Sequence, residues 1–180
     1  MKSLLKYSFL SLLAFSIVSC GSPMGKKVKE PFSGSSYESN NRFFRATGKG
    51  MSSSENIARG KADIQAKSQL AGQVQTNMKQ VSDQYLRENS NTEAADVGEK
   101  FESLTRQVMN TQISDLRKIG EKKFYNGNDY TVFIAYEIKK NAMFRFLKKQ
   151  AKVDKKLSDA ERKTIEAIID EELKKLPEDE

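Results

Sequence analysis

The chain has 180 residues, with 31 basic and 24 acidic side chains, a net charge of +7, one cysteine and no histidine. Without histidine, Ser-His-Asp and Cys-His catalytic systems and the usual zinc sites are excluded, and a single cysteine excludes an intramolecular disulfide. The length is that of one domain with additional segments, so a single hydrophobic core is expected.

The N-terminus has the features of an export signal. The positively charged residues Lys2 and Lys6 come before a short apolar run from Tyr7 to Val18. This run is shorter than the ~20 apolar residues that a membrane-spanning helix needs. We therefore predict that residues 1–19 are a lipoprotein signal peptide, which is removed and takes no part in the fold.

The next residues, Ile17-Val18-Ser19-Cys20-Gly21, resemble the bacterial lipobox, where the signal peptide is cut just before a diacylglycerol-bearing cysteine. The resemblance implies that Cys20 is the lipidated first residue of the mature protein. The alternatives are an ordinary secretory signal that happens to contain a cysteine, and a buried free thiol. Each buried methylene of an acyl chain contributes ~0.8 kcal/mol, so several chains hold a protein at a membrane almost permanently.

The residues after Cys20 predict where the anchor lies. Gly21 stands where inner-membrane lipoproteins of enteric bacteria often carry aspartate, and Ser22 to Lys29 lacks the acidic run of some surface-exported lipoproteins. By this analogy we expect an outer-membrane anchor facing the periplasm. An exported protein does not meet cytoplasmic nucleic acid, so the basic excess favours anionic lipid or glycan surfaces. Residues 20–41, rich in Gly, Ser, Asn and Lys, are predicted to form a lipidated flexible tether.

A strand is predicted from Arg42 to Gly48, with Phe44 and Ala46 on one face. Gly48-Lys49-Gly50 is expected to turn the chain into a helix. A glycine-rich loop before a helix can bind phosphate, but this spacing fits neither a P-loop nor a dinucleotide fingerprint. Strand-to-helix geometry is therefore the favoured explanation of the glycines, and no cofactor is expected.

The helix that follows is the longest predicted element. Ser52 and Glu55 have the spacing of a capping box. Two apolar files run along the helix. The first has a residue at every seventh position, with two valines between them: Ile57, Ile64, Ala71, Val74, Met78, Val81 and Tyr85. The second has a residue at every fourth position: Ala58, Ala62, Ala66 and Leu70. A helix of about thirty residues spans roughly 45 Å, which is more than a small sheet covers. Its second half must therefore pack on another helix or another subunit.

A break is expected near residues 89–91, and a second helix completes a helical hairpin. Its apolar residues are Val97, Phe101, Leu104 and Val108. Two strands follow at 113–125 and 129–139, joined by a turn at Asn126-Gly127-Asn128-Asp129, where Asn and Gly tolerate positive φ. Residues 129–139 alternate strictly and carry bulky side chains on both faces, which predicts a central strand.

The last forty residues, 141–180, are predicted to be a C-terminal helical extension. Its first helix carries a weak apolar stripe among many lysines, formed by Met143, Phe146, Leu147 and Gln150. This basic helix, 141–156, either lies on an anionic membrane or, as we favour, packs on the domain. Ser158 and Glu161 form a second capping box before a helix with a narrow stripe: Ile165, Ile169, Leu173 and Leu176.

Three short motifs resemble the LPP-twenty family of bacterial lipoproteins, which is related to the N-terminal domain of the flagellar T-ring protein. They are Ala46-Thr47-Gly48-Lys49-Gly50, the alanines of the long helix up to Leu70-Ala71, and the run from Tyr130 to Ala135. The resemblance covers residues 42–140 and implies an α+β domain: a β-α-β-β module with a long helix on a small antiparallel sheet. It implies no catalytic residue. This chain differs from the shortest family members by its C-terminal helical extension.

The sequence thus predicts a non-catalytic envelope lipoprotein that is a structural, assembly or protein-docking module. Its expected partners are the membrane, reached through Cys20, and envelope proteins or further copies of itself. The alternative is a periplasmic ligand- or glycan-binding module that uses the hairpin aromatics Phe124, Tyr125, Tyr130 and Tyr136. Paired carboxylates could in principle support catalysis, but acidic residues such as Asp63 and Asp83 are distributed as on solvated helix faces. No metal or cofactor ligands are predicted.

Overall fold

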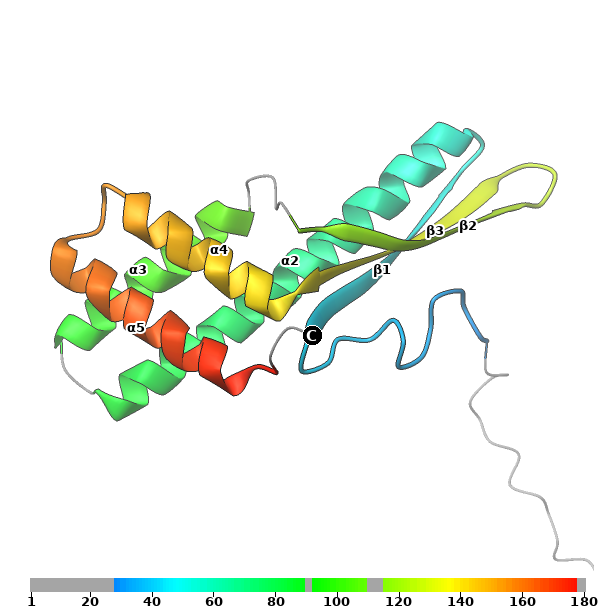
Figure 1. The fold of residues 1–180 in the computed structure, drawn as a ribbon. Coiled ribbons are helices and arrows are strands. Elements are labelled where there is room, and N and C mark those ends of the chain that lie inside the picture. The colour runs from blue at the N-terminus through cyan, green and yellow to red at the C-terminus, as the bar shows by residue number, and fades with distance from the viewer. Residues whose placement is uncertain (1–27, 90–91, 110–114, 178–180) are drawn as a thin grey trace, which may run out of the picture.

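The computed structural model describes residues 28–89, 92–109 and 115–177, and within these ranges the fold is α+β, as predicted (Figure 1). A three-stranded antiparallel sheet has the order β1-β3-β2. In chain order the elements are β1 (Phe43–Ser52), α2 (Glu55–Glu88), α3 (Thr92–Met109), β2 (Arg117–Tyr125), β3 (Tyr130–Lys139), α4 (Lys140–Val153) and α5 (Asp159–Lys175).

The predicted central strand is confirmed. β3 pairs with β1 along its whole length, from Ser52 opposite Tyr130 to Phe43 opposite Lys139, and with β2 on its other side. The hairpin turn has the predicted chemistry. Gly127 has a φ of 97°, and the Asn126 side-chain oxygen accepts hydrogen bonds from the backbone N–H groups of Asn128 and Asp129.

The predicted turn at Gly48–Gly50 is wrong, because both glycines lie inside β1 and the strand continues to Ser52. Their role is to let α2 approach. A Cβ atom on Gly48 would lie 2.1 Å from the carbonyl oxygen of Ala62, and one on Gly50 would lie 2.0 Å from that of Ala58. Only a residue without a side chain permits such a distance between strand and helix.

The predicted capping box at Ser52 and Glu55 is also wrong. Pairing with Tyr130 holds Ser52 in the strand, so the helix starts later, with Ser54 as N-cap and no side-chain cap bond. The Glu55 carboxylate instead forms ion pairs of 2.8 Å with Arg59 and Lys123. The second predicted capping box is confirmed at the start of α5, where the Ser158 and Glu161 side chains bond reciprocally to backbone N–H groups.

The structure decides between the two apolar files of α2. The alanine file is buried and continues through Leu70, Val74 and Met78, whereas Ile57 and Ile64 are 55% and 69% exposed. These isoleucines belong to the apolar stripe predicted along the helix, but they face solvent. The physical reason is that the strand glycines bring the helix so close that only alanine side chains fit between them.

The second half of α2 packs on helices, as its length predicted. In Figure 1 the sheet and the first half of α2 form one end of the molecule, and α3, α4, α5 and the second half of α2 form the other. The larger core cluster joins Phe44 and Ile138 of the sheet to Phe101, Phe144 and the residues around them. A second, smaller cluster lies between the sheet and the first half of α2 and consists of Ala58, Ala62, Val132 and Ile134. The α3 residues Val97, Phe101, Leu104 and Val108 are all buried, as predicted.

The basic helix α4 packs on the domain, in agreement with the favoured interpretation. It buries Met143, Phe144, Leu147 and Ala151, whereas Phe146 is only partly buried, so its apolar stripe is displaced from the predicted one. Its lysines face acidic residues of α5, with Lys148 Nζ 2.6 Å from Asp170. The apolar face of α4 is thus occupied by the protein's own core.

The described part of the expected tether, residues 28–41, lies along the sheet instead of extending freely. Phe32 has a left-handed backbone, with a φ of 56°. Its ring packs directly against Gly120, since a Cβ atom on Gly120 would lie 2.4 Å from the ring. Thr47 Oγ1 donates to the carbonyl of Phe32, and Lys49 pairs with Glu30 at 2.7 Å. Thr47 and Gly120 both lie beside Ala135, on the sheet face opposite to the one that α2 covers.

Candidate functional site

The predicted lipidation site, Cys20, lies outside the described residues, as does the whole predicted signal peptide. Among the described helices, none combines the length and the apolar character required to cross a membrane. Within the same ranges, no group of three or more Cys, Asp or Glu side chains is arranged to hold a metal ion.

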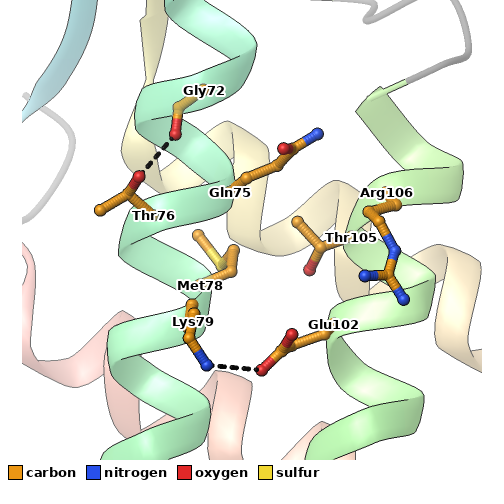
Figure 2. Close-up of a pocket in the computed structure, with 8 residues that line it drawn as sticks. All are labelled: Gly72, Gln75, Thr76, Met78, Lys79, Glu102, Thr105 and Arg106. Carbon is orange, nitrogen blue, oxygen red and sulfur yellow. Dashed lines mark hydrogen bonds and ion pairs between the residues drawn. The ribbon is translucent and has the colours of Figure 1, made fainter.

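A hollow of about 330 Å³ lies between α2 and α3, and Figure 2 shows its lining residues. The Lys79 ammonium reaches across it to the Glu102 carboxylate at 3.4 Å, and it also lies 3.4 Å from Asp83. The hydroxyls of Thr76 and Thr105 donate to carbonyl groups of their own helices. The lysine and the two hydroxyl groups of the hollow are thus engaged with the protein itself.

The charges around Lys79 also favour a structural role. The carboxylates of Glu102 and Asp83 raise the pKa of Lys79 above its usual value, so the amine stays protonated at neutral pH. A lysine that acts as a general base or nucleophile needs its pKa lowered instead. The arrangement is that of a structural ion pair between two helices.

The four hairpin aromatics do not form a single platform. Phe124 and Tyr125 are adjacent in β2, so their side chains lie on opposite faces of the sheet. Phe124 packs edge-on against Phe133, with centroids 6.0 Å apart, and Tyr125 stacks on Tyr130 at 4.6 Å. Both β2 rings are more than half exposed. Tyr136 is partly buried beneath α2.

Tyr136 joins the sheet to the helix. Its hydroxyl donates to Asp63 at 2.5 Å, and Lys67 pairs with the same carboxylate at 2.8 Å. Burial and the bond to Asp63 raise the pKa of Tyr136 to about 12. Burial acts to raise the pKa of Asp63, but the bonds from Lys67 and Tyr136 outweigh it and lower this pKa. Asp63, which showed no partner pattern in the sequence, is therefore a structural anchor.

A second set of charges joins β2 to the start of α2. Arg59 Nε lies 2.8 Å from Glu121, and Lys118 Nζ lies 2.6 Å from the same carboxylate. The bonds from Lys118 and Arg59 lower the pKa of Glu121. This cluster was not predicted from the sequence. Only Glu55 and Arg59, which are four residues apart in α2, have a spacing that the sequence reveals.

Exposed large hydrophobic residues gather at the sheet end of the molecule. They occur at the end of β1, near the start of α2 and beside the hairpin turn: Met51, Ile57, Ile64, Phe124 and Tyr125. Met51 and Phe124 both pair with Thr131 and lie on the sheet face away from α2, whereas Tyr125 lies on the other face and the isoleucines lie on α2. These residues are therefore exposed on several faces of the sheet end. Phe124 and Tyr125 were predicted as candidate binding residues. Ile57 and Ile64 were predicted as part of an apolar stripe, and only the packing of α2 shows that they face solvent.

No protein-family model matches this chain, and no curated protein matches its sequence. The resemblance to the LPP-twenty lipoproteins therefore stays a prediction that rests on the three motifs.

Proposed function

We propose that this protein is a non-catalytic bacterial envelope lipoprotein, anchored by acylated Cys20, that acts as an assembly or protein-docking module. The observation that carries the docking role is the exposure of large apolar side chains at the sheet end, among them Met51 and Phe124, which flank Thr131 of β3 on one face of the sheet. The two charge clusters support a structural role, since each links α2 to the sheet. One does so through the ion pairs of Arg59 with Glu121 and of Lys123 with Glu55, and the other through the hydrogen bond from Tyr136 to Asp63.

The anchor and the folded part are close together under this proposal. Seven residues lie between Cys20 and Val28, the first described residue, and the eight Cα-to-Cα steps between them span at most roughly 29 Å. Residues 28–41 contact the sheet and so do not lengthen the tether. The distance between domain and membrane is therefore limited by the span of the chain between Cys20 and Val28. The favoured location is the outer membrane, facing the periplasm.

The anchor is tested by Cys20→Ser in cells fed an alkyne-bearing palmitate analogue. We expect the original chain to incorporate the label and to sediment with outer membranes, and the variant to lose both properties, because serine cannot carry the thioether-linked lipid. Ser22→Ala is the matched control and should behave as the original chain does. Labelling that persists in Cys20→Ser, or an original chain that remains unlabelled, would contradict the proposal.

A further inference from the structure

The two edges of the sheet differ in whether their outward-facing N–H and C=O groups have hydrogen-bond partners. At the outer edge of β1, side chains from neighbouring segments take the place of a fourth strand. The Arg45 N–H donates to Ser39 Oγ at 2.8 Å, and the Arg45 carbonyl accepts from the Gln73 side-chain amide at 2.9 Å. The Lys49 N–H donates to Gln65 Oε1 at 2.6 Å. Further bonds close the two ends of this edge: the Phe43 N–H donates to Asn40 Oδ1, and the Lys61 ammonium donates to the Met51 carbonyl.

The edge formed by β2 has no such cover within the described residues. β2 bonds to β3 on one side only, and no described side chain or loop bonds to its outward-facing backbone. Alternation of the ladder directs the N–H and C=O groups of Glu121, Lys123 and Tyr125 away from β3. An uncovered edge of this kind is a template for another strand.

The charge of β2 selects the partner. Its side chains include four basic residues, Arg117, Lys118, Lys122 and Lys123, and one acidic residue, Glu121. Three of the basic residues already have a carboxylate partner in the protein: Lys118 pairs with Glu121, Lys123 with Glu55 and Arg117 with Glu137. Their side chains remain 48%, 45% and 68% exposed, so a further carboxylate can still reach them. Glu121 is already bound by Lys118 and Arg59. A second copy of this chain would place another basic strand against β2, and like charges on facing strands are destabilising. An acidic strand would instead find opposite charges along the edge.

We propose that β2 binds an extended acidic segment of another protein, which adds to the sheet as a fourth strand. The proposal rests on the docking function proposed above and names its site. Backbone hydrogen bonds to Lys123 and its neighbours supply affinity, and the lysines and Arg117 supply the preference for acidic side chains. Phe124 and Tyr125, exposed on opposite faces, contact apolar side chains of the added strand near the hairpin turn.

The test uses the full chain purified in detergent and a labelled nine-residue peptide of alternating Glu and Thr with blocked ends. Binding is followed by fluorescence anisotropy. We expect this peptide to bind at least about tenfold more tightly than the same peptide with Lys in place of Glu. Lys123→Pro removes an outward N–H and should weaken binding by about tenfold or more.

Lys123→Ala is the matched control, because it loses the same side chain and the same ion pair to Glu55 but keeps the N–H donor. Its affinity should stay clearly above that of Lys123→Pro. A second measurement does not depend on how the variants fold. Peptides N-methylated at alternate amides keep one hydrogen-bonding edge and should still bind, whereas a peptide N-methylated at every amide keeps its charges and should not bind.

Three results would overturn the proposal. Equal binding of acidic and basic peptides would remove the charge preference, and equal binding by Lys123→Pro and Lys123→Ala would remove the backbone contribution. Self-association of the chain that Lys123→Pro abolishes would show that a second copy occupies β2. Each result concerns this edge alone, whereas failure of the Cys20 labelling experiment would refute the lipid anchor.

Discussion

Gly48 and Gly50 set the distance between β1 and α2. At both positions the two nearest atoms that an added Cβ would meet belong to the helix backbone, namely carbonyl oxygens and amide nitrogens of Ala58, Ala62 and Ala66. Backbone atoms cannot rotate away as the end of a flexible side chain can, so a methyl group there must displace the helix. These two glycines therefore decide which face of α2 meets the sheet.

We predict that Gly50→Ala lowers the free energy of unfolding by about 3 kcal/mol or more, because overpacking against rigid atoms forces the helix away from the sheet. Gly60→Ala is the matched control. This glycine lies in α2 with nothing within 4 Å of an added Cβ, so alanine should stabilise the protein by about 0.5–1 kcal/mol. Urea denaturation of both variants gives the comparison. A neutral Gly50→Ala would contradict the close approach.

At the scale of elements, α2 is held on the sheet by small apolar contacts and by one polar link. Ala58 and Ala62 pack on Val132 and Ile134, while Tyr136 donates to Asp63 beside them. The polar link fixes the position of α2 along β3, since a shift of the helix would leave the partly buried hydroxyl without its acceptor.

This link predicts a loss of stability at alkaline pH. The pKa of Tyr136 is raised to about 12 in the folded protein, so its stabilising contribution is complete below about pH 10 and is lost as pH rises towards 12. Tyr136→Phe removes the hydrogen bond and should cost about 1 kcal/mol at neutral pH.

The measurement is the thermal midpoint of both proteins across this pH range. The difference between the original chain and Tyr136→Phe should shrink as pH rises from 10 to 12, because only the original chain loses this bond. A difference that stays constant over the range would show that the bond to Asp63 contributes no proton linkage. The absorbance change of tyrosine ionisation should include one group that titrates last in the original chain and is missing in the variant.

At the scale of the whole molecule, α2 and Tyr136 connect the two ends. α2 contacts the sheet with its first half and the other helices with its second half, and Tyr136 packs against both core clusters. Phe44 and Ile138 of the sheet also belong to the same cluster as Phe101. Contacts shared between the two ends favour unfolding as a single cooperative unit.

We therefore predict that damage to the helical end destabilises the sheet end equally. Phe101 is fully buried, and Phe101→Ala should cost about 3–5 kcal/mol; Phe101→Leu, which leaves a smaller cavity, is the milder control. Hydrogen exchange of backbone amides in α3 and β3 is the measurement. Both elements should lose protection by the same amount, and β3 amides that keep full protection would show that the two ends unfold separately.

Several features followed from the sequence alone, because they depend on local pattern. Strict alternation identified β3 as a central strand, helical spacing identified the buried residues of α3, and Ser158 with Glu161 identified the start of α5. The lipobox and Cys20 can be recognised only in the sequence, since they lie outside the described residues. The lack of histidine limits the available chemistry whatever the fold.

Other features depended on contacts between distant residues. Spacing allowed two apolar faces for α2, and the glycines of β1, which admit only small side chains, selected the alanine face and left Ile57 and Ile64 exposed. Pairing with β3 extended β1 to Ser52 and so removed the predicted capping box. The covered edge of β1 and the open edge of β2 exist only once Ser39, Gln65 and Gln73 are folded against the sheet. Periodicity shows which residues share a face, but the shape of the surface opposite decides which face is buried.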